Sequence, residues 1–280
     1  MSNSLEKNVS IIKRSTLKLC ARCRLILGHL LRLLPADIAI RIPTGINKGF
    51  HWIRGYGTAP EWMGVYERSK QKIVRELVVS GNSVFDIGAN AGFYTLAFSR
   101  LVGSNGSVFA FEPLGRNCAK ILRHLSVNRI ENVILMQCAI SEFTGIISFQ
   151  PGKNDFVGKI SACGSYLIPA FSLDDFVARQ RIADPDLIKI DVEGAEAAVL
   201  KGAGKILQRR RPLILLALHG ESQCAECFEI LQDLHYTLRT FGGDVITKAK
   251  AMPAEVIAAV EERPETGVAA CRGEPVNVNS

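Results

Sequence analysis

The chain has 280 residues, enough for one large α/β domain with appendages but short for two independent domains. About half of the residues are apolar, which supports a sizeable core and excludes a largely disordered chain. The formal net charge of +7 suits an anionic partner. Much of the basic excess lies near the N-terminus, so we interpret it as a local feature and expect no nucleic-acid partner.

The first segment, 1–60, is interpreted as a basic helical extension. Within 13–32 there is no acidic residue, and the basic residues are Lys13, Arg14, Lys18, Arg22, Arg24 and Arg32. Two explanations stay open for 11–34: a helix lying on an anionic membrane, or an amphipathic helix packed on the main domain. We favour the second, because any surface helix shows this periodicity. The segment lacks the uncharged apolar length of a spanning helix and the form of a signal peptide, so we expect a cytoplasmic protein with at most peripheral contact to the inner membrane face.

The chain contains eight cysteines. Two C-x-x-C pairs, Cys20/Cys23 and Cys224/Cys227, have the ligand types of a four-cysteine zinc site. About 200 residues separate the pairs, far beyond the usual spacing of zinc modules, and both fall in stretches that read as helix. Ordinary buried or half-buried thiols in a reducing compartment are therefore favoured.

From Lys70 onward, short apolar runs alternate with helical patterns. The expected strands are 83–87, 107–112, 132–138, 187–191 and 212–218, and the expected helices are 71–79, 90–101, 114–128, 193–208 and 221–234. This alternation predicts a doubly wound, mostly parallel α/β sheet over a domain that spans 61–250. Right-handed crossovers place the carboxyl ends of the strands at one edge, where ligands of open α/β sheets bind.

Two segments depart from this rhythm. The stretch 145–171 begins with an alternating strand and then turns polar, so we expect an insertion that forms a wall of the substrate site. The last segment, 251–280, is expected to form a helix and then a loose tail, because its composition becomes rich in Pro, Gly and Glu beyond Glu261.

The sharpest motif is the glycine-rich turn that follows the first strand of this domain, DIGANAGF from Asp86. Gly88 and Gly92 let the backbone approach a ligand closely, and a helix that begins near Asn90 presents free N–H groups. The spacing is G-x-x-x-G, not the G-x-G-x-x-G of a dinucleotide site. Since Asp86 would repel a pyrophosphate, the turn favours a ligand with cationic amino and sulfonium groups, namely S-adenosylmethionine; a tight turn without a ligand is the alternative.

Further chemistry-bearing residues are expected at the same edge. Glu112 ends the second strand, where open α/β nucleotide sites place a carboxylate on ribose hydroxyls. Asp191 ends the fourth strand, and Glu193 and Glu196 fall in the expected first turn of the next helix, which favours acidic residues. We interpret Asp191 as functional and Glu196 as structural, and leave Glu193 open. His219 follows the fifth strand and is a candidate general base.

In this order, the segments DIGANAGFYTL, FEPLGRN, SVN, SLDDF and DLIKIDVEGAEAAVLKGA resemble the FkbM family of methyltransferases. The resemblance covers roughly Trp62 to His219. It implies a class I methyltransferase fold, Rossmann-like with a seven-stranded sheet that has one antiparallel strand. It also implies S-adenosylmethionine as methyl donor and O-methylation of a hydroxyl on a sugar, a glycan, or a glycosylated or polyketide-type small molecule.

The resemblance also implies roles for particular residues. Those expected around the methionine part of the cofactor are Asp86, Gly88, Ala89, Asn90 and Gly92. Glu112 would bind the ribose. Asn117, Ala139 and Ile140 would lie near the adenine. Asp191 would face the amino group or the reacting centre, and Asp191 or His219 would take or guide the hydroxyl proton. Nothing in the sequence requires a metal.

One departure from the family pattern leaves an alternative open. The family commonly has a Glu two residues before the His, where this sequence has Ala217. A lapsed methyltransferase that only binds, held at membranes by its basic N-terminus, is therefore the alternative function. An oxidoreductase that uses NAD on the same scaffold is disfavoured, because the G-x-G-x-x-G turn is missing.

Overall fold

A computed structural model describes residues 37–151, 158–160, 164 and 166–260. The expected helix of 11–34, the expected tail beyond 261 and the pair Cys20/Cys23 lie outside the described residues. Among the described cysteines, Cys118, Cys138, Cys224 and Cys227 are free thiols. No helix in the described part of the chain is long and apolar enough to cross a membrane.

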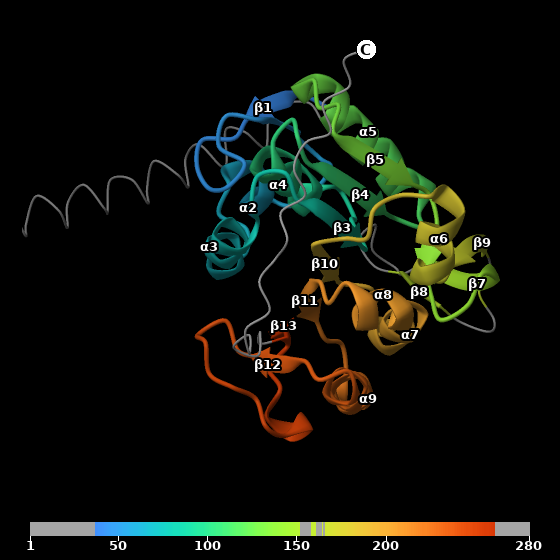
Figure 1. Ribbon diagram of the computed structural model, residues 1–280. Coiled ribbons are helices and arrows are strands. Elements are labelled where there is room, and N and C mark those ends of the chain that lie inside the picture. Colours follow the sequence, from blue (N-terminus) through green and yellow to red (C-terminus); the bar gives the residue numbers. More distant parts are fainter. Residues whose placement is uncertain (1–36, 152–157, 161–163, 165, 261–280) are drawn as a thin grey trace, which may run out of the picture.

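The main sheet has seven strands in the order β12-β13-β11-β10-β3-β4-β5 (Figure 1). Its strands are β3 (Ser83–Ile87), β4 (Ser107–Phe111), β5 (Val133–Met136), β10 (Leu187–Ile190), β11 (Leu213–Ala217), β12 (Thr237–Arg239) and β13 (Glu255–Ala259). Neighbours from β11 to β5 pair in parallel, while β13 runs antiparallel to both β11 and β12. The doubly wound sheet with one antiparallel strand is thus confirmed.

Helices cover both faces of this sheet because alternate strand residues point to opposite sides. Phe85 and Ile188 face a core shared with α6 (Leu173–Gln180), α7 (Glu196–Gly202), α8 (Gly204–Arg209) and α9 (Glu221–Asp233). Val84 and Leu187 face the other core, which is shared with α3 (Arg68–Leu77), α4 (Phe93–Val102) and α5 (Gly115–Asn128). The short helix α2 (Ala59–Met63) precedes α3. The central strands β3, β4, β10 and β11 are buried on both faces, as their continuous apolar runs predict.

The described part of the N-terminal extension packs on the main domain. Its hairpin consists of β1 (Ala39–Arg41) and β2 (His51–Ile53). Trp52 is fully buried and stacks on His124 of α5, with ring centroids 4.0 Å apart. The Ile53 N–H donates to His124 Nε2 at 3.0 Å, and the other ring nitrogen bonds the Ala91 carbonyl at 2.9 Å. The hairpin is thereby tied to the glycine turn after β3.

The insertion expected at 145–171 forms most of a second, four-stranded sheet of order β6-β9-β7-β8. Its strands are β6 (Ala139–Ile140), β7 (Gly145–Pro151), β8 (Gly158–Ile160) and β9 (Tyr166–Phe171). From this sheet Ala139, Ile140 and Phe149 reach the cavity described below. Of the insertion itself, Phe149 contributes to the cavity wall, and its role in a substrate site stays a prediction.

Three expected helix positions are corrected by the structure. The helix expected from Asn90 begins at Phe93, because Asn90 and Gly92 adopt left-handed φ angles of 52° and 89°. The helix expected from Glu193 begins at Glu196, because Glu193 has a φ of 56°; it also ends at Gly202, and α8 follows as a separate helix. Glu193 thus lies in a turn, not in the first turn of a helix.

The C-terminal helix expected within 251–280 is also corrected. Residues 249–251 form a 3₁₀ turn, η1, and 255–259 form strand β13 between β11 and β12. Val256 and Ala258 of β13 are fully buried in the core of the α6–α9 face. The main sheet therefore continues past residue 250, where we expected the domain to end.

Candidate active site

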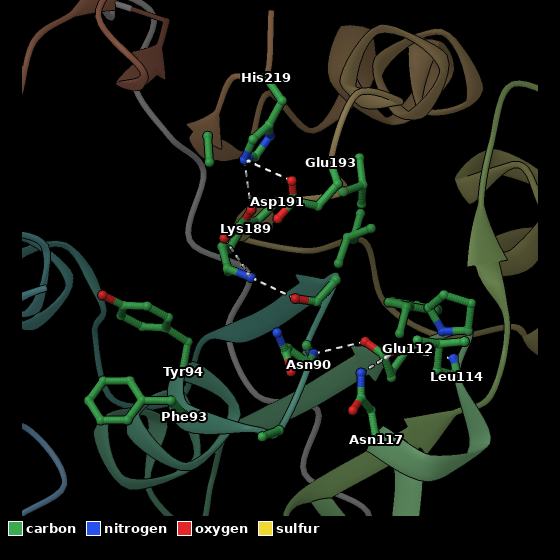
Figure 2. A pocket seen from close by; sticks show the side chains of 18 of the residues that line it. Asn90, Phe93, Tyr94, Glu112, Leu114, Asn117, Lys189, Asp191, Glu193 and His219 are labelled. Atoms are coloured by element: carbon green, nitrogen blue, oxygen red, sulfur yellow. Dashed lines mark hydrogen bonds and ion pairs between the residues drawn. The ribbon is translucent and has the colours of Figure 1, made fainter. Parts of the chain in front are cut away.

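A cavity of about 440 Å³ opens at the carboxyl edge of the main sheet. This volume falls in the range of small-molecule and cofactor sites. Glu112 and Asn117 lie at one end of the view in Figure 2, and Asp191, Glu193 and His219 lie at the other. The residues that line the cavity come from the ends of β3, β4, β10 and β11, from α3 and α4, and from β6, β7 and β13.

The glycine turn after β3 is shaped by close backbone contact with the end of β10. Gly88 has a φ of 77°, and a Cβ placed there would lie 1.9 Å from the carbonyl oxygen of Asp191. The Gly88 and Ala89 N–H groups donate to the Phe111 carbonyl at 3.0 and 3.1 Å. Only glycine fits at position 88, so this residue joins the turn to two neighbouring strands and brings its backbone into the cavity wall.

Glu112 is held in one orientation by three donors. Its Oε2 accepts from the Asn90 N–H at 2.8 Å, and its Oε1 accepts from the Leu114 N–H at 3.0 Å and from the Asn117 amide at 3.2 Å. Burial raises the pKa of Glu112, and these hydrogen bonds oppose that rise. The carboxylate lines the cavity and is fixed there before any ligand binds.

Asp86 lies behind the cavity wall, not in it. Its fully buried carboxylate accepts from the Thr95 hydroxyl at 2.6 Å and pairs with Lys189 Nζ at 3.1 Å. Lys189 lines the cavity, and its ammonium also donates to the Gly88 carbonyl at 2.9 Å and lies 3.8 Å from Asp191. Burial alone would lower the pKa of Lys189, but Asp86 and Asp191 outweigh it and the pKa is raised. The negative charge of Asp86 is thus balanced by Lys189 within the protein and does not face the cavity.

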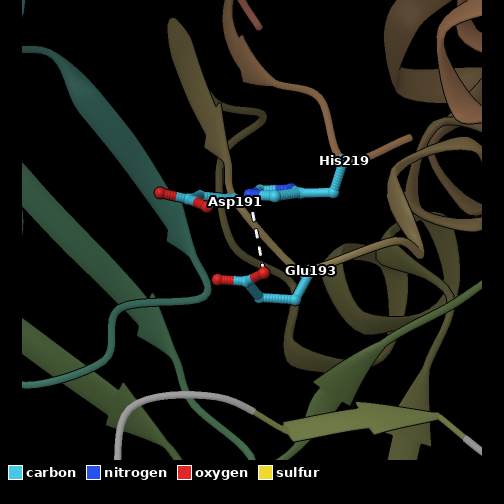
Figure 3. A group of neighbouring side chains, drawn as sticks. All are labelled: Asp191, Glu193 and His219. Carbon is cyan, nitrogen blue, oxygen red and sulfur yellow. Dashed lines mark ion pairs between the residues drawn. The ribbon is translucent and has the colours of Figure 1, made fainter. Parts of the chain in front are cut away.

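A second polar group lies just beyond the ends of β10 and β11, at the end of the cavity away from Glu112. His219 Nδ1 bonds Glu196 Oε1 at 2.8 Å, while its Nε2 lies 3.6 Å from Glu193 and 3.8 Å from Asp191 (Figure 3). The hydrogen bond that His219 donates to Glu196 is the main cause that raises the pKa of His219, although burial opposes it. Glu196 is fully buried, and this hydrogen bond orients the imidazole. The sequence predicted a structural role for Glu196, and positioning His219 is a role of that kind.

The remaining wall is made by residues to which the sequence assigns no role in the site. Tyr94 donates from its hydroxyl to Glu67 at 2.8 Å, and Lys70 pairs with Glu67 at 3.2 Å and with Glu255 of β13. Lys70 is almost fully buried, and its ammonium lies 5.2 Å from the centre of the Tyr94 ring. Tyr66 also lines this wall. A network of aromatic rings and paired charges therefore forms the cavity wall that faces the carboxyl edge of the main sheet.

The structure brings most of the expected site residues to one cavity. Those that line it are Gly88, Ala89, Asn90, Glu112, Asn117, Ala139, Ile140, Asp191 and His219. Asp86 and Gly92 do not line it: Asp86 faces Lys189, and Gly92 packs against Ile121 of α5, where a Cβ would lie 3.1 Å from a side-chain carbon.

Sequence reasoning missed Lys189 and the Tyr66–Lys70 wall. Lys189 did carry a signal: it is a lysine inside the apolar run LIKI, and a fully buried lysine requires partners. The wall carried no comparable signal, because its parts come from α3, α4 and β13 and meet only in the fold.

Comparison with known proteins agrees with this geometry. The family model described as "Methyltransferase FkbM domain" matches residues 86–238, more than half of the chain. The chain belongs to the FkbM methyltransferase family. The match begins at Asp86, so this FkbM domain includes the glycine turn, Glu112, Asp191 and His219, but neither the α3 part of the wall nor Glu255.

Three curated relatives are similar to this FkbM-family chain. The hexuronic acid methyltransferase AglP of Haloferax volcanii is 32% identical over half of the chain and 59% of its own length. The 2-O-methyltransferase NoeI of Sinorhizobium fredii is 26% identical over 46% of the chain and 60% of its own length. The 31-O-demethyl-FK506 methyltransferase FkbM of Streptomyces tacrolimicus is 28% identical over 44% of the chain and 59% of its own length. The chain thus spans about three fifths of each.

A crystal structure of a methyltransferase FkbM from Methylobacillus flagellatus is 20% identical to this chain, with a TM-score of 0.48. The matched region covers 69% of this chain and 46% of the Methylobacillus flagellatus chain.

Proposed function

We propose that this chain is an S-adenosylmethionine-dependent O-methyltransferase whose acceptor is a hydroxyl of a sugar, a glycan, or a glycosylated or polyketide-type small molecule. The observation that carries the proposal is the single cavity that joins the glycine turn, the fixed carboxylate of Glu112, and the pair Asp191 and His219. Membership of the FkbM family and the hydroxyl-methylating names of the relatives support it.

The cofactor is expected to lie along the end of β3 and β4. The Glu112 carboxylate lines the cavity, and its Oε2, which accepts one hydrogen bond from Asn90, can accept another from a ribose hydroxyl. Gly88, Ala89 and Asn90 bring the backbone alongside the methionine part, and Asn117, Ala139 and Ile140 border the adenine side. Asp86 is paired with Lys189 behind the wall, so Asp191, which follows β10 and lines the cavity, is the carboxylate that we expect to face the cofactor's amino group or sulfonium.

The reaction is an in-line displacement at the methyl carbon. The acceptor oxygen forms a bond to that carbon while the carbon–sulfur bond breaks and its electron pair stays on sulfur, which gives S-adenosylhomocysteine. The hydroxyl proton passes to Asp191 or His219, which line the same end of the cavity. The protein contributes position and a polar site shielded from water.

A second candidate function is a lapsed methyltransferase that binds the cofactor without turnover. Ala217 favours it, because this residue lines the cavity where a Glu commonly stands in the family. The retained pair Asp191 and His219 opposes it. A methyl-transfer assay with labelled cofactor over neutral, amino and acidic glycosides decides between the two, since the lapsed protein would bind cofactor and label none of them.

The cofactor claim is tested by calorimetric titration of the full chain with S-adenosylmethionine, S-adenosylhomocysteine and NAD. We expect micromolar binding of the first two and none of NAD. The substitution E112A should weaken binding of both methionine compounds by about a hundredfold, because the charge-assisted hydrogen bond to the ribose is lost. Failure of the folded chain to bind either methionine compound would remove the proposed function.

A further inference from the structure

Asp191, Glu193 and His219 present three ligand atoms to one point. One oxygen of each carboxylate and one imidazole nitrogen all lie within 4.8 Å of one another. His219 Nε2 is 3.6 Å from Glu193 Oε2 and 3.8 Å from Asp191 Oδ1. Divalent cations bind such atoms at about 2.0–2.3 Å, which puts neighbouring ligands about 3–4.5 Å apart. The spacing is that of cation ligands and is too long for hydrogen bonds between the side chains.

Glu196 fixes which nitrogen of His219 faces the two carboxylates. A carboxylate only accepts, so the hydrogen lies on Nδ1, which donates to Glu196 Oε1 at 2.8 Å. Gly194 N–H donates to the same oxygen at 3.0 Å and holds the carboxylate in place. Nε2 is therefore left without a hydrogen, and its lone pair is on the side of the ring that faces Asp191 and Glu193. Figure 3 shows these three side chains together. Histidines that bind metals are oriented in this way by a carboxylate on the other ring nitrogen.

The charges around this point do not balance within the described residues. Asp86 and Glu196 are fully buried, and Asp191 and Glu193 line the cavity nearby. Lys189 is the ammonium that pairs with Asp86 and Asp191. Glu196 Oε2 is buried without a hydrogen-bond partner in the described structure. Four carboxylates thus share one ammonium and one imidazole, and a dication would offset this excess of negative charge. Burial makes the charge costly at Asp86 and Glu196, whereas Asp191 and Glu193 are 29% and 40% exposed and open to the cavity.

We propose that Asp191, Glu193 and His219 bind a divalent cation of the Mn²⁺ or Zn²⁺ kind, which accepts mixed nitrogen and oxygen ligands. Its remaining coordination positions face the cavity, because all three side chains line it. The role of the cation, though not its binding, rests on the proposed function. It takes the acceptor hydroxyl as a further ligand and polarises its O–H bond. His219 then acts as a ligand, and the hydroxyl proton passes to the oxygen of Asp191 that the cation leaves free.

The test is titration of the chelator-treated full chain with MnCl₂, followed by calorimetry and by the electron paramagnetic resonance signal of free Mn²⁺. We expect one Mn²⁺ per chain. E193Q and H219A should each weaken its binding at least tenfold. E196Q should weaken it about tenfold, because it disturbs the group that orients the histidine. The control E229Q, at an exposed site on α9, should bind Mn²⁺ as the unaltered chain does.

Each variant is also titrated with S-adenosylhomocysteine without metal, which reports the fold and the cofactor half of the cavity. Retained binding there with lost Mn²⁺ binding in E193Q and H219A supports the cation site. No Mn²⁺ binding at millimolar concentration, or equal binding by E193Q, H219A and the unaltered chain, overturns it. Neither result bears on the proposed function, which fails only if the methionine compounds do not bind.

Discussion

The two sides of the cavity are built in different ways. The cofactor side is local: Gly88, Asn90 and Glu112 come from two adjacent strand–turn segments and are linked by backbone hydrogen bonds. The opposite wall joins Lys70 of α3 to Glu255 of β13, residues 185 positions apart in the chain. A short sequence motif can encode the first side, whereas the second exists only once distant parts of the chain have packed. We therefore expect substitutions on the first side to affect cofactor binding and those on the second to spare it.

The largest effect is expected from G88A. A Cβ at this position would meet the Asp191 carbonyl at 1.9 Å, so the end of β10 must move. We expect a loss of about 4 kcal/mol or more in the free energy of unfolding and no detectable cofactor binding. Thermal unfolding and calorimetry measure both. G81A is the matched control: Gly81 also has a positive φ but would meet nothing within 4 Å, so it should cost only about 1 kcal/mol of strain. Equal effects of the two substitutions would contradict the close packing of this turn.

K189M should have the next largest effect, because it leaves the fully buried Asp86 without its counter-charge. Breaking such a pair costs about 3–5 kcal/mol. The double variant D86L/K189M removes both charges and should recover a large part of this loss in urea unfolding. If the double variant were as unstable as K189M or more so, neutralising Asp86 would not be the reason that Lys189 stabilises the protein.

A smaller effect concerns pH and the hairpin that is tied to the glycine turn. Burial lowers the pKa of His124 to about 4. In the unfolded chain the imidazole has an ordinary pKa of about 6.5, so its contribution is fully present above that pH and is lost as pH falls toward the folded value. We expect His124 to lower the free energy of unfolding by about 2 kcal/mol between pH 7.5 and 5. His219, whose pKa is raised, contributes with the opposite sign. H124Q should flatten this dependence in urea titrations at the two pH values, and an unchanged slope would count against it.

The smallest effect is expected from E255Q, on the distant wall. It weakens the partly exposed pair with Lys70 and leaves Glu67 as that lysine's partner. Stability should fall by about 1 kcal/mol or less, and the affinity for S-adenosylhomocysteine should stay within about twofold. A tenfold loss of cofactor affinity in calorimetry would show that the two sides are not separate in function.

The same contrast explains what the sequence could predict. Strands β3, β4, β10 and β11 follow from apolar runs bounded by turns, and the positions of Glu112, Asp191 and His219 follow from where those runs end. The number of strands and the single antiparallel strand follow from the resemblance of the motifs to a family. These features depend on residues close together in the chain.

What failed depends on contacts between distant residues. The segment EVIAA of β13 contains good helix formers, and its pairing with β11 and β12 makes it a strand. Asp86 was expected to face the ligand, but it forms an ion pair with Lys189 of the neighbouring strand β10. Glu193 was expected in a helix, but a left-handed φ turns it toward His219.

A crystal structure of the chain with S-adenosylhomocysteine tests the central claim most directly, because it locates the cofactor relative to both sides of the cavity. The account predicts the ribose hydroxyls on the Glu112 carboxylate, the methionine part along the Gly88 turn, and the sulfur directed at Asp191 and His219. A ligand bound with its ribose away from Glu112, or with its sulfur directed away from that pair, would contradict it.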